Sequence, residues 1–125
     1  MVMQQALTDK KLGEFIRLLR LNKELKKSFI KSVEITQEQQ ESYMLKYGHL
    51  YYVCIDEYNN PVGFVGVVNN DLRIAVHPDH RNKGVGTFML KYILEYFIPE
   101  IKVRKTNLNG QKFFYKHKLK YTVVD

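Results

Sequence analysis

The chain has 125 residues, of which 45% are hydrophobic and 13% aromatic, and it carries a formal net charge of +7. That length suits one domain spanning residues 1–125 and excludes a second core of useful size. The apolar content argues against disorder, and the apolar runs are too short to cross a bilayer, so no membrane partner is expected.

Cysteine and histidine usage favours a reducing compartment and no metal. Cys54 is the single cysteine, which excludes an internal disulfide, so we expect a cytoplasmic location. The first residues, MVMQQALTDKK, lack a basic segment followed by an apolar one, so no signal peptide is expected. The four histidines are scattered, and no Cys/His pair has metal-ligand spacing.

The N-terminal half has the pattern of a short strand followed by helices. A strand is expected in VMQQAL, and Thr8-Asp9 is a candidate N-cap for the amphipathic segment KKLGEFIRLLRL. A second helix is expected over NKELKKSFIKS. Thr36 to Gln39 forms a capping box for a helix that runs to about Lys46 and ends at Gly48.

The rest of the chain predicts a mixed sheet. LYYVCIDE, VGFVGVV and LRIAV are joined by short turns, which predicts an antiparallel meander. A helical period begins at Gly84 and ends by Pro99, and IKVRKT then predicts a strand parallel to LRIAV, with the helix as crossover. NGQKFFYKHK predicts a last helix and LKYTVV a last strand. The expected class is α/β (α+β), a mixed, mostly antiparallel sheet with helices on both faces.

The joint VHPDHRNKGVG, between LRIAV and the following helix, is the most informative segment. A helix N-terminus presents free N–H groups and the positive end of its dipole to an anion. Gly84 and Gly86 allow a bulky anion to approach, Arg81 and Lys83 add charge, and Thr87 adds a hydroxyl. The pattern is neither the nucleotide P-loop GxxxxGK[ST] nor the dinucleotide-binding motif GxGxxG, so it predicts a phosphate-binding site of another kind.

Arg81-x-x-Gly84-x-Gly86 resembles the acyl-CoA-binding signature (Q/R)-x-x-G-x-(G/A) of the GNAT superfamily of N-acetyltransferases. The order of segments agrees over residues 50–121, including Asn107-x-x-Gly110 before an aromatic helix. The resemblance implies that LRIAV and IKVRK are a splayed parallel pair holding acyl-CoA.

The resemblance also implies how the cosubstrate acetyl-CoA is held. Backbone N–H groups of residues 81–87 would bind its pyrophosphate, and the main chain of LRIAV would pair with its pantetheine arm like an added strand. The binding residues implied are Ile74, Ala75, Val76, Arg81, Asn82, Lys83, Gly84, Val85, Gly86, Thr87, Asn107, Gly110 and Phe114.

Acetyl transfer to an amine needs a neutral amine, a donor to the oxyanion and a proton for the departing thiolate. The resemblance implies the Val76 N–H as oxyanion donor. The family's acid is a tyrosine in a pattern like N-x-x-(S/A)-x-x-(L/F)-Y-x-x-x-G-F, which places Phe114 at the tyrosine position here. Either the helix is shifted by one residue and Tyr115 is the acid, which we favour, or Phe114 only packs and water protonates the sulfur.

No side chain is an obvious general base. Asp71, at the start of LRIAV, is the candidate, acting through water, and otherwise it is a turn residue. His49 and His77 are alternatives, with a structural role favoured for His77. Cys54 has no adjacent base, so direct attack in a ternary complex is expected.

The expected function is therefore transfer of an acetyl group from acetyl-CoA to a primary amine. SFIKSVEITQEQQ loosely resembles family members that acetylate amino sugars on nucleotide carriers or protein N-termini. Two alternatives stay open: a GNAT-like domain that binds acyl-CoA without transfer, and, less favoured, a nucleic-acid-binding module using FFYKHKLKY. Seven Lys/Arg against one Asp/Glu in residues 102–125 suit any of these anionic partners. A homodimer is a candidate assembly, because pairing adds buried area to a small domain.

Overall fold

The computed structural model describes residues 1–22, 24–25 and 35–125. Its elements are β1 (Val2–Gln5), α1 (Lys10–Leu21), α2 (Gln37–Tyr47), η2 (Gly48–Leu50), β2 (Tyr51–Ile55), β3 (Pro61–Val68), β4 (Asp71–Val76), η3 (Pro78–His80), α3 (Val85–Leu94), β5 (Lys102–Arg104), α4 (Leu108–Lys116) and β6 (Thr122–Val124). The predicted strands and the other predicted helices are confirmed. The helix expected over NKELKKSFIKS falls mostly outside the described residues.

Local side-chain chemistry accounts for the two N-terminal helices. The Asp9 side chain accepts a hydrogen bond from the first turn of α1. In α2, the Thr36 hydroxyl accepts from the Gln39 N–H at 3.1 Å, and the Gln39 side chain accepts from the Thr36 N–H at 3.0 Å. The predicted capping box is thus confirmed. Gly48 ends α2 where an added Cβ would lie 1.9 Å from the Leu7 carbonyl oxygen, so no larger residue fits there.

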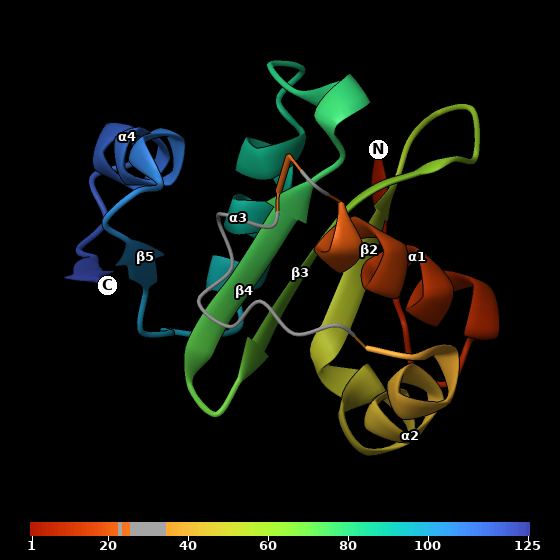
Figure 1. Cartoon of the computed structure of the whole chain (residues 1–125). Coiled ribbons are helices and arrows are strands. Elements are labelled where there is room, and N and C mark those ends of the chain that lie inside the picture. The colour runs from red at the N-terminus through yellow and green to blue at the C-terminus, as the bar shows by residue number, and fades with distance from the viewer. Residues whose placement is uncertain (23, 26–34) are drawn as a thin grey trace.

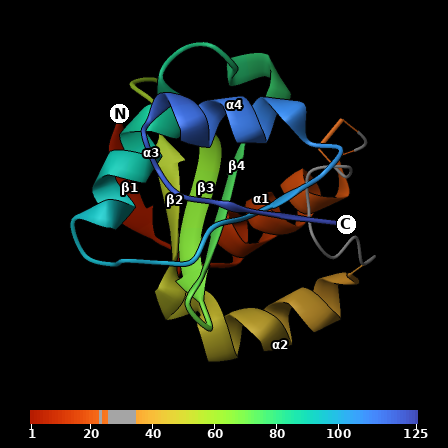
Figure 2. The same cartoon turned by 90° about the vertical axis from the view of Figure 1, so that its left-hand side faces the viewer.

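The first four strands form one antiparallel sheet in the spatial order β1-β2-β3-β4. Side chains alternate between its faces, so Tyr51 and Phe64 pack with Ile16 of α1, whereas Val65 packs with Met89 of α3. Figures 1 and 2 show α1 and α2 on one side of this sheet, and α3 and α4 on the other. The prediction of helices on both faces is confirmed.

Strands β4 and β5 start together and then separate. A single parallel bridge joins Asp71 to Glu100, where the Leu72 N–H donates to the Glu100 carbonyl at 2.9 Å. Beyond that point β5 pairs with β6, in parallel, rather than with β4. In Figure 1, β5 and α4 stand apart from β4. The parallel, splayed pair predicted from the sequence is therefore present.

Within the described segments, every helix is too short or too polar to span a membrane.

Candidate active site

The joint between β4 and α3 forms an N-terminus that lacks a side-chain cap. The chain leaves β4 at His77, passes through η3 and enters α3 with Gly84 as the N-cap residue at φ +81°. Within residues 1–22, 24–25 and 35–125, no side chain accepts a hydrogen bond at this N-cap, so the first-turn N–H groups of α3 are left for another acceptor. A Cβ placed on Gly84 would meet nothing within 4 Å. Gly84 is therefore needed for its left-handed backbone, and the space beside it is open.

Gly86 is needed for a different reason. A Cβ at Gly86 would lie 3.3 Å from two ring atoms of Phe113 and 3.6 Å from a methyl carbon of Val76. The glycine thus lets α4 approach the first turn of α3. The sequence predicts the same role for both glycines, clearance for an anion, whereas in the structure Gly86 also accommodates the ring of Phe113.

A second contact holds α4 to α3. The Thr87 hydroxyl oxygen lies 3.1 Å from His117 Nε2, and the His117 ring stacks edgewise on Phe113 at a centroid distance of 4.9 Å. Burial lowers the pKa of His117, and the nearby cations Lys116 and Lys91 lower it further. His117 is therefore neutral near pH 7 and can hydrogen-bond to Thr87 as donor or acceptor.

The charged side chains at the joint lie at the surface. Arg81, Asn82 and Lys83 are exposed. Arg81 Nη1 lies 3.7 Å from Glu24 Oε2, an exposed ion pair of the kind that contributes little to stability. An anion reaching this turn can therefore compete with Glu24 for Arg81 at small cost.

The diverging edge of β4 presents main-chain groups that have no strand partner among the described residues. The Leu72 N–H points toward β5, and the His77 N–H points toward β3, where it donates to a carbonyl at 2.8 Å. Strand N–H groups alternate in direction, so those of Ile74 and Val76 point toward β5 and that of Ala75 toward β3. Since β5 does not pair with β4 there, Ile74 and Val76 are the two predicted residues whose amides face the divergence.

The predicted residues of α4 separate into a cap and a core residue. Asn107 Oδ1 accepts from the Gly110 N–H at 2.9 Å, and a Cβ on Gly110 would lie 2.5 Å from Asn107 Nδ2. This pair caps α4. Phe114 is 6% exposed and packs in the core, whereas Tyr115 is 78% exposed. The structure therefore does not bring Tyr115 into the core beside Phe114, and the aromatic residue next to Gly86 is Phe113, which the sequence did not single out.

A protein-family model for the acetyltransferase (GNAT) domain matches residues 47–119, more than half of the chain. The chain belongs to the GNAT family of acetyltransferases. No curated protein sequence matches it at a significant level.

Solved structures share the GNAT fold at low sequence identity. A GNAT acetyltransferase from Streptococcus pneumoniae is 17% identical, with 93% of this chain and 82% of that one covered and a TM-score of 0.71. Spermidine N-acetyltransferase from Vibrio cholerae, solved with CoA and spermine, is 22% identical, with coverages of 76% and 62% and a TM-score of 0.63. The apo form of YjaB from Escherichia coli is 18% identical, with coverages of 93% and 81% and a TM-score of 0.61.

Asp71, the candidate base of this GNAT domain, lies where β4 and β5 are joined. Its Oδ1 forms an ion pair with Lys102 Nζ at 3.2 Å, next to the bridge with Glu100. Val76 is at the opposite end of β4, roughly 17 Å away at the usual rise of a strand. The contacts of Asp71 thus support a structural role at the start of the divergence, and its action as a base stays a prediction.

The opposite face of β4 carries a polar cluster that the sequence did not reveal. Arg73 Nη1 donates to the hydroxyls of Tyr43 at 3.0 Å and Tyr51 at 3.3 Å, and the two hydroxyl oxygens are 2.8 Å apart. Burial opposes the charge of Arg73, but Tyr51, Tyr43 and Asp71 together outweigh it and raise the pKa of Arg73. Burial also raises the pKa of Tyr43, with a further contribution from Tyr51. The cluster therefore consists of a guanidinium cation held by two tyrosine hydroxyls.

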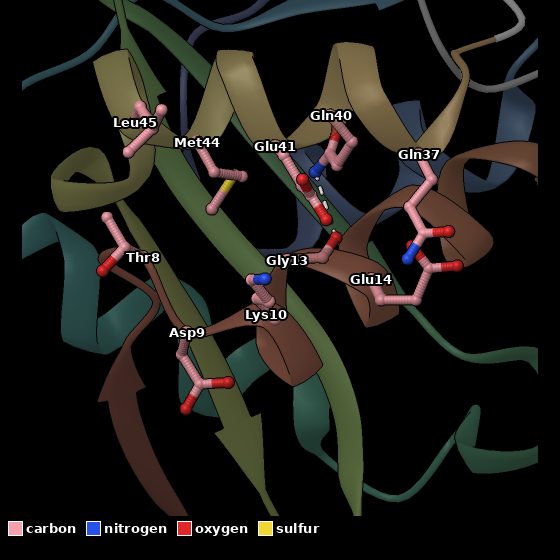
Figure 3. A pocket seen from close by; sticks show the side chains of 10 residues that line it. All are labelled: Thr8, Asp9, Lys10, Gly13, Glu14, Gln37, Gln40, Glu41, Met44 and Leu45. Atoms are coloured by element: carbon pink, nitrogen blue, oxygen red, sulfur yellow. Dashed lines mark hydrogen bonds between the residues drawn. The ribbon is translucent and has the colours of Figure 1, made fainter.

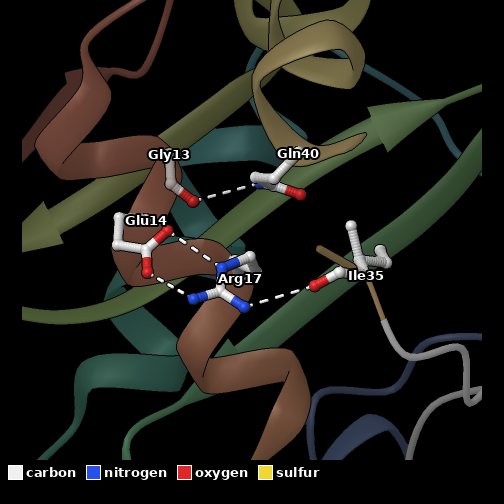
Figure 4. Close-up of polar contacts among 5 residues, drawn as sticks. All are labelled: Gly13, Glu14, Arg17, Ile35 and Gln40. Atoms are coloured by element: carbon white, nitrogen blue, oxygen red, sulfur yellow. Dashed lines mark hydrogen bonds and ion pairs between the residues drawn. The ribbon is translucent and has the colours of Figure 1, made fainter. Parts of the chain in front are cut away.

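Two pockets lie away from the joint. One, of about 310 Å³, lies between α1 and α2 and is shown in Figure 3. Beside it, Gln40 Nε2 donates to the Gly13 carbonyl at 3.0 Å, and Arg17 joins Glu14 to the Ile35 carbonyl, as Figure 4 shows. The other pocket, of about 600 Å³, is lined by residues 99–101 and 119–122. Neither pocket is lined by residues 81–87.

Metal and thiol chemistry find no support in this site. Over the described ranges, no group of three or more His, Cys, Asp or Glu side chains could hold a metal ion. Cys54 is buried in the sheet, and burial raises the pKa of its thiol, which makes it a poor nucleophile near neutral pH.

Proposed function

We propose that this GNAT domain transfers an acetyl group from acetyl-CoA to a primary amine by direct attack in a ternary complex. One observation carries the proposal: the unpaired main-chain edge of β4 leads directly to the uncapped N-terminus of α3. Such a helix N-terminus suits a pyrophosphate, and an unpaired strand edge suits an extended arm with amide groups. Acetyl-CoA has both parts in this order.

The binding mode proposed divides the ligand between these two features. The pyrophosphate would accept hydrogen bonds from the N–H groups of Val85, Gly86 and Thr87. The pantetheine arm would lie between β4 and β5 and bond to Ile74 and Val76. The seven Lys/Arg of residues 102–125, against one Asp/Glu, would favour the adenosine phosphates by long-range attraction.

The chemistry proposed uses few side chains. The amine lone pair attacks the thioester carbonyl, the oxyanion formed accepts a hydrogen bond from the Val76 N–H, and the carbon–sulfur bond then breaks. The amine loses one proton and the sulfur gains one. Tyr115 as donor of that proton stays a prediction, and its 78% exposure supports the alternative in which water is the donor.

The acceptor proposed is a primary amine. A nucleotide-linked amino sugar and a protein N-terminus remain the candidates predicted from the sequence. Spermine is present in the structure of the Vibrio cholerae spermidine acetyltransferase, but a net charge of +7 disfavours a polycation here. The cytoplasmic location and the homodimer stay predictions.

A second candidate function is acyl-CoA binding without transfer. It is favoured by the packing of Phe114 in the core, which leaves no hydroxyl at the position where the family pattern has its tyrosine. Acyl-CoA would then bind to the same groups of β4 and α3 without being turned over.

Two assays test the proposal. Acetyl-CoA at about 100 times its Kd should raise the unfolding temperature by on the order of 10 °C. Thiol release from acetyl-CoA, followed across a panel of amines, should then increase with at least one amine. Stabilisation without amine-dependent thiol release would favour binding alone, and no stabilisation by acetyl-CoA would contradict both functions.

A further inference from the structure

The second face of β4 bears on which amine is accepted. The proposed pyrophosphate-binding N–H groups are in the first turn of α3. Acetyl-CoA would therefore enter the gap between the separating strands β4 and β5 from the side of the sheet that α3 and α4 cover. An acceptor then reaches the thioester from the face covered by α1 and α2. Arg73 lies on that face, because its side chain contacts Tyr43 of α2.

Arg73 forms no ion pair with a carboxylate in the part of the chain that the structure describes, although Asp71, two residues away on β4, attracts its charge from a longer distance. Arg73 is half-buried, and its nitrogen Nη1 donates to two tyrosine hydroxyls. The nearest carboxylate on its own strand, Asp71, is paired with Lys102 at 3.2 Å. A partly buried guanidinium gains most from an anion that takes two parallel N–H bonds, and neutral hydroxyls do not supply this.

We propose that the acceptor amine also bears an anionic group, a carboxylate or a phosphate, that binds to Arg73. This inference rests on the proposed acetyl transfer and names its acceptor class. Tyr43 and Tyr51 hold the guanidinium in place, and their hydroxyls share Nη1. Arg73 is thus a specificity-determining residue.

The strand geometry adds a length requirement. Arg73 and Val76 are three residues apart on β4, about 10 Å at the usual strand rise. The amine would react near Val76, so its anionic group should be several bonds away from the nitrogen. An amino-sugar phosphate meets this requirement better than an α-amino acid does.

The test compares amines in matched pairs. Glucosamine 6-phosphate is assayed against glucosamine, and 6-aminohexanoate against its amide, with spermidine as a polycation. For the wild type we expect kcat/KM to be about 10- to 100-fold higher with the anionic member of at least one pair. The phosphate pair and the carboxylate pair then distinguish the two anions.

Variants assign the preference to Arg73. Arg73→Gln should reduce it to about unity, and Arg73→Lys should keep part of it, because a lysine retains charge without the bidentate fork. Lys46→Gln is the matched control: it removes one positive charge from exposed α2, where Lys46 lies over Tyr47 at 5.2 Å, and should leave the preference unchanged. Thermal unfolding and acetyl-CoA binding of each variant report whether the fold is intact.

The outcomes separate this inference from acetyl transfer itself. The inference is overturned, with acetyl transfer itself intact, if the uncharged member of each pair or spermidine is turned over as well as the anionic members. It is also overturned if Arg73→Gln keeps the preference for the anionic members. If no amine is turned over, calorimetric binding of the same pairs to the CoA-bound protein decides. Tighter binding of the anionic members, lost in Arg73→Gln, supports the inference, and equal or undetectable binding overturns it.

Discussion

The first turn of α3 differs from the first turns of the other described α-helices. Asp9, Thr36 and Asn107 cap α1, α2 and α4 with side-chain oxygens, whereas Gly84 begins α3 with none. A side-chain cap stabilises a helix by satisfying its own N–H groups. A helix that begins at a left-handed glycine keeps those groups for a ligand. The difference sets the α3 N-terminus apart from three side-chain-capped N-termini and supports the proposal that it binds the pyrophosphate of acetyl-CoA.

The largest expected effect comes from placing a negative charge at the N-terminus of α3, where the pyrophosphate is proposed to bind. Gly84→Asp should weaken acetyl-CoA binding by about 100-fold or more, because the carboxylate competes with the pyrophosphate for the same N–H groups. Aspartate tolerates the left-handed conformation better than most residues, so folding should be retained. Calorimetry gives the affinity, and circular dichroism gives the unfolding temperature.

The control for that variant is Thr36→Asp, which places the same charge at the cap of α2. It should leave the acetyl-CoA affinity unchanged. Equal losses of affinity in the two variants would mean that net charge, rather than the α3 N-terminus, governs binding.

The second effect concerns the proton for the thiolate. If water is the donor, Tyr115→Phe should keep kcat within about threefold of wild type, whereas loss of a general acid costs about 100-fold or more. Thiol release at saturating acetyl-CoA measures it. A loss near 100-fold with unchanged acetyl-CoA binding would instead make Tyr115 the acid, as the sequence predicts.

A smaller effect comes from removing a structural cap. Thr36→Ala should lower the free energy of unfolding by about 1 kcal/mol, because the Gln39 N–H loses the Thr36 hydroxyl as its acceptor, while the bond from the Thr36 N–H to the Gln39 side chain is kept. Acetyl-CoA affinity should not change. Chemical denaturation measures the free energy of unfolding, and calorimetry measures the acetyl-CoA affinity. A weakened affinity at unchanged stability would contradict the distinction between the structural cap of α2 and the binding site at the N-terminus of α3.

The smallest effect is a pH dependence from His117. Its pKa is lowered in the folded protein, first by burial and then by Lys116 and Lys91, so protonation favours the unfolded chain. The stability linked to neutral His117 is therefore present above about pH 6.5 and is lost as the pH falls through the lower folded pKa. His117→Gln should flatten this part of the stability profile. An identical profile in wild type and variant between pH 7 and 5 would exclude the linkage.

Much of this could be predicted from the sequence where short-range chemistry decides the structure. Asp9 and the Thr36 capping box begin the helices where predicted, and α3 begins next to Gly84, where the helical period begins in the sequence. The splayed strands follow from the order of segments and the family resemblance. The caps depend on residues within a few positions of one another, whereas the splayed pair joins segments about 30 residues apart and was predicted from the family resemblance.

The features that escaped prediction depend on tertiary packing. Phe113, Phe114 and Tyr115 are adjacent, so only the rotation of α4 about its axis decides which one enters the core and which one meets Gly86. Arg73 reads as an ordinary charge in a strand, because its partners Tyr43 and Tyr51 are 30 and 22 residues away.

Backbone amide chemical shifts during an acetyl-CoA titration test the central claim most directly. The amides of Val85, Gly86 and Thr87 should move with the largest amplitude, together with those of Ile74 and Val76. The first-turn amides of α1 and α2 should stay in place. Saturable binding that shifts the α1 or α2 amides and leaves residues 84–87 unmoved would contradict the account.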